Sequence, residues 1–248
     1  CFNFMGGTGS IIINAFIQIG LMFLLPLFLY SLLSKTKIKK TFNTFQFKYC
    51  SLKTILTSFL LGVFVYFAVV LISTFCASFW HLIGYRSPSI PTTPTAPDTS
   101  VLTGLLLPIL TTAILPAFCE EFANRGLLLN GLLTENNARR SILFTAICFG
   151  LLHYNINQAI YAVFVGLVVG SLVYYTKSIF PAMIVHFTNN FLATYFGWAS
   201  DANAFGGAFN QLLSSLLSGS FVGVFIKSML VILFVGAGLI LIMSEIYR

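Results

Sequence analysis

Ionisable side chains lie inside apolar stretches of this sequence at three places: Glu120, Glu121 and Arg125 in the first, His153 in the second and His186 in the third. The amide of Asn190 lies four residues after His186. A charged side chain in the middle of a bilayer costs roughly 2.5–3.5 kcal/mol, and such residues usually mark a functional site. Carboxylates and imidazoles serve proteins in acid–base chemistry, zinc binding and proton relays. We therefore interpret these residues as a candidate site.

Helical spacing places several of these residues on shared faces. Residues four positions apart lie on one face of a helix, so Glu121 can pair with Arg125, and His186 lies beside Asn190. Glu120 and Glu121 point about 100° apart around a helix. We therefore expect Glu121 and Arg125 to form a structural ion pair, while Glu120 faces a cavity.

The same residues are expected at a common depth. Glu120 precedes the polar turn 134–140 by 14 residues, His153 follows that turn by 13, and Asn190 follows Lys177 by 13. At a rise of 1.5 Å per residue, each distance is about 20 Å. Three separate helices therefore place polar groups at a similar depth in the membrane. This common depth favours a chemical role for Glu120, His153 and His186 over chance placement.

The composition requires that these helices lie in a membrane. Of the 248 residues, 58% are hydrophobic and 8% are charged, and the mean hydropathy is +0.94. Soluble domains carry roughly 25% charged residues, so this chain is an integral membrane protein. This excludes cytosolic enzymes, secreted disulfide scaffolds and disordered proteins. The five cysteines include no CxxC pair, so we expect neither a disulfide framework nor a thiolate zinc site.

We predict an all-α, polytopic membrane helical bundle with about seven transmembrane helices. A span needs roughly 20 apolar residues, and a short interfacial helix is expected at 212–217. The predicted spans are 11–33, 54–83, 101–133, 141–154, 157–175, 178–198 and 221–243. We expect three parts: 1–100 with two spans, a basic loop and a Pro-rich external loop, 101–198 with the candidate site, and 199–248 with a loop and the final span.

Charge predicts the orientation in the cell membrane. Cytoplasmic loops are rich in Lys and Arg, so the basic loop between the first two spans is expected in the cytoplasm and not on a nucleic acid. The N-terminus then lies outside and the C-terminus inside. The aromatic residues of this loop predict a segment lying on the membrane surface. The lysines are Lys35, Lys37, Lys39, Lys40, Lys48 and Lys53, and the aromatic residues are Phe42, Phe45, Phe47 and Tyr49.

Three motifs in a fixed order carry a resemblance to a known family. They are EExxxR (Glu120, Glu121, Arg125), FxxxH (Phe149, His153) and HxxxN (His186, Asn190). In a polytopic chain, this order resembles the CPBP family, which includes the CAAX prenyl proteases and the bacteriocin-processing or Abi intramembrane proteases. The resemblance covers about 103–196, so 101–198 is the expected catalytic core. The family often has an aromatic residue before the Arg, where Asn124 stands here.

The resemblance implies an intramembrane endopeptidase that cleaves a membrane-associated or lipidated peptide. Glu120 and His153 would activate a water molecule, while His186 and Asn190 would stabilise the oxyanion. Glu121 and Arg125 would order the site. These roles agree with the chemistry, because burial raises the proton affinity of a carboxylate and fixed N–H donors stabilise an oxyanion. The substrate is a peptide or protein in the bilayer, either a prenylated CAAX protein or a leader peptide or pheromone.

Zinc chemistry and two functions without proteolysis stay open. Glu120, His153 and His186 can together ligate Zn²⁺ and leave a position for water. We favour no cofactor, because there is no HExxH motif and His186 has no obvious carboxylate on its own helix to accept its second N–H. A proton-coupled transporter would use the same ionisable groups as a relay, but no inverted repeat is visible. A non-catalytic membrane protein would act in binding or immunity.

Overall fold

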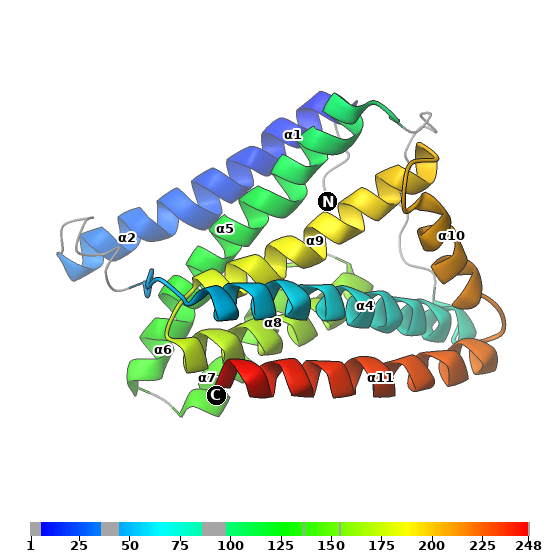
Figure 1. Cartoon of the computed structure of the whole chain (residues 1–248). Coiled ribbons are helices and arrows are strands. Elements are labelled where there is room, and N and C mark those ends of the chain that lie inside the picture. Colours follow the sequence, from blue (N-terminus) through cyan, green and yellow to red (C-terminus); the bar gives the residue numbers. More distant parts are fainter. Residues whose placement is uncertain (1–5, 36–44, 86–97, 136, 154, 248) are drawn as a thin grey trace.

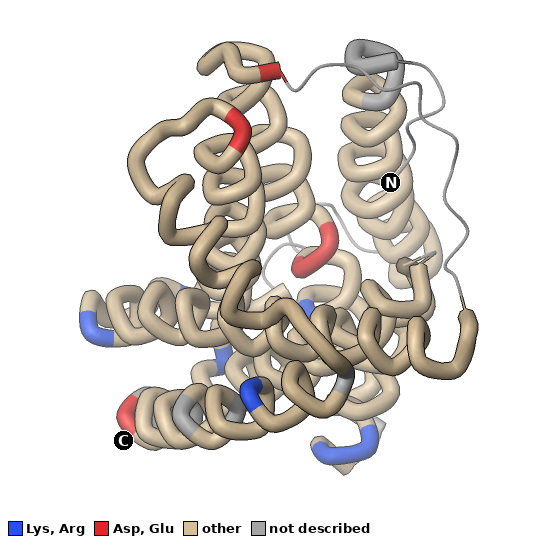
Figure 2. Tube along the Cα trace, turned by 90° about the vertical axis from the view of Figure 1, so that its right-hand side faces the viewer, with Lys and Arg blue, Asp and Glu red and all other residues tan. Residues whose placement is uncertain are grey.

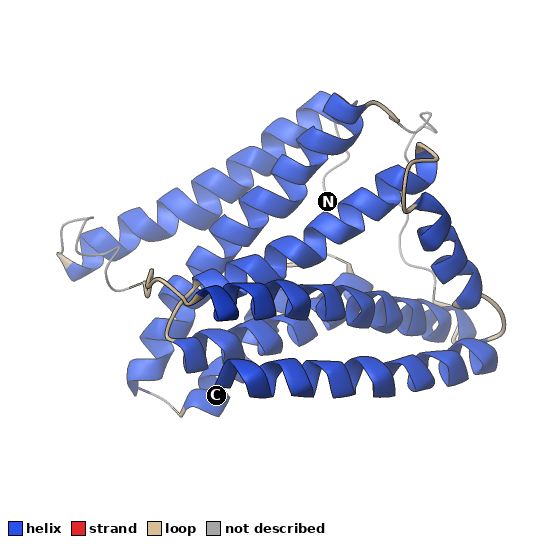
Figure 3. Ribbon diagram, viewed as in Figure 1, coloured by secondary structure: helices blue, strands red, loops and turns tan. Residues whose placement is uncertain are grey.

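The computed structural model describes residues 6–35, 45–85, 98–135, 137–153 and 155–247. These residues form helices and loops, with no strand among them (Figures 1 and 3). The elements are α1 Gly6–Ala15, η1 Phe16–Leu24, α2 Leu25–Ser34, α4 Leu52–Leu82, η2 Val101–Leu106, η3 Ile109–Ile114, α5 Leu115–Glu121, η4 Phe122–Leu129, α6 Asn130–Glu135, α7 Ala138–Leu151, α8 Ile156–Thr176, α9 Phe180–Asp201, α10 Gly207–Leu216 and α11 Phe221–Tyr247.

Two long helices each change their hydrogen-bond register along their length. The first runs through α1, η1 and α2, and the second runs from η2 to α6. The η segments are π-helical, so each N–H bonds the carbonyl five residues back. Such turns are uncommon and often lie at functional sites. Here η4 begins directly after Glu121 and contains Arg125, so one of these π-helical segments lies among the candidate site residues.

The structure confirms an all-α polytopic bundle. Within the described ranges, five helices are long and apolar enough to cross a membrane: Ile11–Ser34, Leu52–Leu82, Val101–Thr134, Ile156–Thr176 and Val222–Glu245. The other two predicted spans correspond to α7 and α9. With 14 residues, α7 is about 21 Å long, which is shorter than a hydrocarbon core of about 30 Å. With 22 residues, α9 is long enough, but its polar face lowers its hydropathy.

The core forms where α4, α8, α9 and α11 meet. Its fully buried side chains are aliphatic, among them Leu61, Val169 and Val185. Beside this core, α7 packs closely on α8. Gly166 and Gly170 form a GxxxG stripe on α8, and small residues at this spacing let two helices approach closely. This contact places α7 beside the helices that carry the site.

The predicted membrane-surface segment is wrong for Phe45. Phe45 is 1% exposed and packs against Phe122 with ring centroids 4.6 Å apart, whereas Tyr49 is 99% exposed. The chain is anchored there because Ser178 donates to the Lys48 carbonyl at 2.6 Å. The aromatic pattern of a loop does not reveal which helices it packs against, and here Phe45 is buried in a cluster with Leu27 and Phe122. Phe42 lies outside the described residues.

Two loop predictions also change. The region predicted as a loop at 199–210 contains the end of α9 and the start of α10, and α10 is longer than the helix predicted at 212–217. Most of the Pro-rich loop, residues 86–97, lies outside the described residues. Among the described residues, the Lys and Arg positions lie in the lower half of Figure 2, where the C-terminus also lies.

Candidate active site

Glu120 and Glu121 end α5 and have different surroundings. The side chain of Glu121 is fully buried, whereas that of Glu120 is 17% exposed. One oxygen of Glu121 accepts from Arg125 at 3.0 Å and from Nδ1 of His186 at 2.8 Å. The predicted ion pair is therefore present, and it includes a third partner from α9. The two adjacent carboxylates therefore differ in environment, because only the side chain of Glu120 keeps some exposure.

The contact between Glu121 and His186 fixes the imidazole ring. An ionised carboxylate only accepts, so Nδ1 of His186 carries the proton and donates it to Glu121. Nε2 of His186 then points at Glu120, with 4.0 Å between Nε2 and Oε2. The carboxylate that His186 lacks on its own helix is supplied by α5. The lack of such a carboxylate therefore no longer counts against His186 as a metal ligand.

Arg125 ties this ion pair to the neighbouring helices. Its Nη2 donates to the Gly166 carbonyl of α8 at 3.4 Å. The guanidinium carbon of Arg125 lies 4.5 Å from the centroid of the Phe149 ring on α7. Arg125 is fully buried. Four helical segments, α5, η4, α7 and α8, are thereby joined around one charge.

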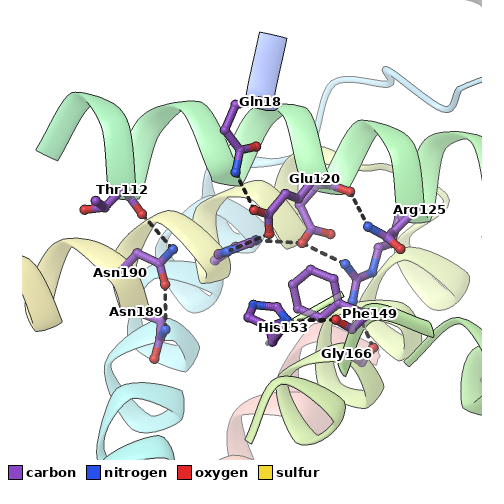
Figure 4. A network of polar contacts seen from close by, with 12 residues as sticks. Gln18, Thr112, Glu120, Arg125, Phe149, His153, Gly166, Asn189 and Asn190 are labelled. Carbon is purple, nitrogen blue, oxygen red and sulfur yellow. Dashed lines mark hydrogen bonds and ion pairs between the residues drawn. The ribbon is translucent and has the colours of Figure 1, made fainter. Parts of the chain in front are cut away.

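His153 lies just beyond the end of α7. Its Nδ1 is 2.8 Å from the Phe149 carbonyl, which only accepts, so Nδ1 carries a proton and donates it to this carbonyl. The Phe149 ring lies 5.1 Å from the His153 ring and 5.9 Å from the His186 ring, edge to face in both cases. Phe149 thus contacts both histidines of the motifs, and Figure 4 shows His153 beside it.

Glu120 has a partner that the sequence interpretation missed. The Gln18 side chain, from η1, donates its Nε2 to Oε1 of Glu120 at 2.6 Å (Figure 4). Asn124, on the same face as Glu120, donates instead to the Glu120 backbone carbonyl at 2.9 Å. Gln18 is uncharged and was not among the predicted site residues, although an amide within the apolar stretch 11–33 is a detectable signal.

Asn190 faces the neighbouring helix and not Glu120. Its amide donates to the Thr112 carbonyl at 2.9 Å and accepts from Asn189 at 2.9 Å. In an α-helix the Thr112 carbonyl would bond the N–H of residue 116, which is a proline and has none. Asn190 therefore satisfies a carbonyl next to a helix irregularity. Its role as an oxyanion donor stays a prediction.

Zinc binding by Glu120, His153 and His186 stays an alternative prediction. Among the described residues, no group of three His, Cys, Asp or Glu side chains is placed to hold a metal ion. We therefore derive no step through a metal.

Comparison with known families gives a match over the central part of the chain. Residues 102–192 match the family described as "Rce1-like: Type II CAAX prenyl endopeptidase Rce1-like". The match contains all three motifs and confirms the predicted similarity of this segment to the CPBP and CAAX proteases. At the level of the family, it indicates a membrane-embedded endopeptidase and hence a hydrolase. No curated protein and no solved structure matches the chain.

Proposed function

Because residues 102–192 match a CAAX-type endopeptidase family, we propose that this protein hydrolyses a peptide bond within the membrane by activating a water molecule. One observation carries the proposal. Glu120 approaches His186 to 4.0 Å, while Glu121 and Arg125 beside them are fully buried and paired. A separation of 4.0 Å is too long for a direct hydrogen bond and suits a bridge through one water molecule.

Glu120 is the proposed general base. Its Oε2 removes a proton as the water oxygen attacks the scissile carbonyl carbon, and the tetrahedral intermediate forms. The protonated Glu120 then gives this proton to the leaving nitrogen as the C–N bond breaks, which restores the carboxylate. His153 is proposed to orient the attacking water by accepting its other hydrogen at Nε2.

His186 and Asn190 are the proposed oxyanion stabilisers. With Nδ1 held by Glu121, an N–H at Nε2 of His186 would donate to the oxyanion. Asn190 would exchange its bond with the Thr112 carbonyl for the oxyanion. Glu121 and Arg125 hold these groups in position without reacting themselves.

The proposed substrate is a membrane-associated or lipidated peptide. The name of the matching family refers to a CAAX prenyl endopeptidase, and a prenylated peptide is accordingly one of the two candidate substrates. The other is a leader peptide or pheromone that lies in the bilayer. No nucleic acid is proposed as a partner, because a lysine-rich loop between two spans is accounted for by the membrane charge bias.

The test compares purified wild-type protein and Glu120→Gln in proteoliposomes, with both classes of peptide as substrates. Glutamine keeps the shape of the side chain but does not accept the proton. We expect cleavage by the wild type and no detectable cleavage by Glu120→Gln, with the same thermal unfolding profile for both. Cleavage by both proteins would exclude Glu120 as the base. Peptide binding without cleavage would favour a non-catalytic binding protein, and proton uptake without cleavage would favour a transporter.

A further inference from the structure

We infer that Gln18, on the N-terminal helix, is a positioning residue for the proposed base Glu120. Gln18 is 6% exposed, and its Nε2 lies 2.6 Å from Oε1 of Glu120. Gln18 lies well before the matching segment 102–192. The inference rests on the proposed function, because positioning has a catalytic effect only if Glu120 acts as the base.

The hydrogen bond from Gln18 gives the two oxygens of Glu120 different surroundings. Oε1 is held by Gln18, and Oε2 is left 4.0 Å from Nε2 of His186. A glutamate side chain has several rotatable bonds, and restraining it before the reaction lowers the entropy lost in the transition state. Gln18 therefore selects the rotamer in which Oε2 faces the proposed water position.

The helix that carries Gln18 is fixed against the third span by other contacts. Phe23 packs against Phe118 and Phe122, with ring centroids 5.2 and 4.7 Å apart. Asn14, one turn before Gln18, donates to the Thr111 carbonyl at 2.8 Å. These contacts hold the N-terminal helix against the third span without Glu120. We therefore assign the Gln18 contact to the positioning of Glu120 and not to the docking of the two helices.

The state of the Gln18 amide supports the same conclusion. Its Oε1 is buried and has no hydrogen-bond partner among the described residues. A buried amide with one unbonded atom is unfavourable, and such groups are uncommon in folded proteins. The amide nevertheless turns its nitrogen to Glu120, as an acceptor-only carboxylate requires. A leucine at this position would avoid the unbonded oxygen, but it would leave the Glu120 rotamer unrestrained.

The experiment measures kcat and KM for Gln18→Leu in proteoliposomes, with Asn14→Leu as the matched control. Both substitutions remove an amide contact between the same two helices, but only Gln18 touches Glu120. We expect Gln18→Leu to lower kcat by about 10- to 100-fold with KM within about twofold, because misplacing a reacting group by about 1 Å costs about 100-fold. Asn14→Leu is expected to keep kcat. Gln18→His, which retains an N–H donor, is expected to recover part of kcat.

Three outcomes would overturn the inference or its premise. Wild-type kcat for Gln18→Leu, with Glu120→Gln inactive, would refute the role of Gln18 and leave the proposed function intact. An equal loss of kcat in Asn14→Leu and Gln18→Leu would show that Gln18 only joins the two helices and does not position Glu120. Activity in Glu120→Gln would refute the proposed function itself, whatever Gln18→Leu does.

Discussion

At the scale of residues, the two adjacent glutamates show how one sequence pair serves two purposes. Glu121 is fully buried and bonds both Arg125 and His186 through one oxygen. Glu120 keeps some exposure and has one oxygen bonded by Gln18. A buried charge is tolerated when it is paired and hydrogen-bonded. Glu121 meets that condition through one of its two oxygens, since its Oε2 is buried without a partner among the described residues, and Glu120 is the proposed base.

The buried ion pair predicts a large effect on stability. Arg125→Leu leaves the Glu121 carboxylate buried without its cation, and breaking a buried pair in this way costs about 3–5 kcal/mol. We expect a lower midpoint of thermal unfolding in detergent and loss of cleavage.

The matched control for this prediction is the double variant Glu121→Leu/Arg125→Leu, which removes both charges. It is expected to lose less stability than the two single variants would lose in sum. Additive losses would contradict a direct pair between these side chains.

His186 and Asn190 separate the metal-free mechanism from zinc chemistry. As oxyanion donors, His186→Ala and Asn190→Ala should each lower kcat by about 10²–10³-fold. Cleavage is expected to survive 1,10-phenanthroline, and elemental analysis is expected to find less than one zinc per chain. If His186→Ala instead loses bound zinc while Asn190→Ala retains it, the metal-free mechanism is refuted and the protease proposal stands.

At the scale of elements, the short helix α7 depends on α8 for its position. α7 carries Phe149, and His153 follows its end, so a shift of α7 moves both of these side chains. α7 meets the GxxxG stripe of α8, where Gly166 also offers its carbonyl to Arg125 at 3.4 Å. One small residue therefore serves both the packing of two helices and the buried charge.

Gly166→Ala is expected to weaken both stability and activity. A methyl group at Gly166 would lie 2.8 Å from Cα of Ala146, closer than side chains approach backbone, so α7 has to move. Overpacking of this kind costs about 1–3 kcal/mol. The control is Gly131→Ala in α6, where an added methyl group meets nothing within 4 Å. Thermal unfolding and kcat are the measurements, and equal values for the two variants would contradict close packing at Gly166.

The sequence predicted contacts within a helix better than contacts between helices. Spacing of four gave the Glu121–Arg125 pair, which the structure shows at 3.0 Å. Spacing carries no information on which helix faces which, so the bond from His186 to Glu121 was not foreseen. The contact from Gln18 was missed for the same reason, and because an uncharged amide stands out less than a charge in an apolar stretch.

Helix irregularities limited the prediction of side-chain directions. The depth estimates assumed straight α-helices, whereas η3 and η4 are π-helical and Pro116 lies between them. The Thr112 carbonyl next to this irregularity takes Asn190 as its partner. The sequence shows Pro116 but not which side chain compensates for its missing N–H, because that depends on packing against α9.

At the scale of the whole molecule, the site lies between the two ends of the bundle and uses more than the matching segment. The N-terminal helix contributes Gln18, and α4 and α11 form the core on which α8 and α9 pack. The division into 1–100, 101–198 and 199–248 stays a prediction, and the contact of Gln18 with Glu120 crosses its first boundary.

Orientation in the cell membrane is predicted from the charges and tested at two exposed positions. Tyr49 is 99% exposed and follows the basic loop, and Phe205 is 92% exposed and follows α9. They lie at opposite ends of α9, because Lys48 bonds Ser178 just before its start, and its 22 residues span about 33 Å. The bias of Lys and Arg toward the cytoplasm places Tyr49 inside and Phe205 outside.

The test uses single cysteines at these two positions in a variant whose five native cysteines are replaced. A maleimide that does not cross membranes is expected to label Phe205→Cys in intact cells and Tyr49→Cys only after permeabilisation. Retained peptide cleavage shows that each variant is folded. The reverse labelling pattern would invert the orientation and place the basic loop outside, against the charge bias. Labelling at both positions in intact cells would contradict a bundle that separates the two ends of α9.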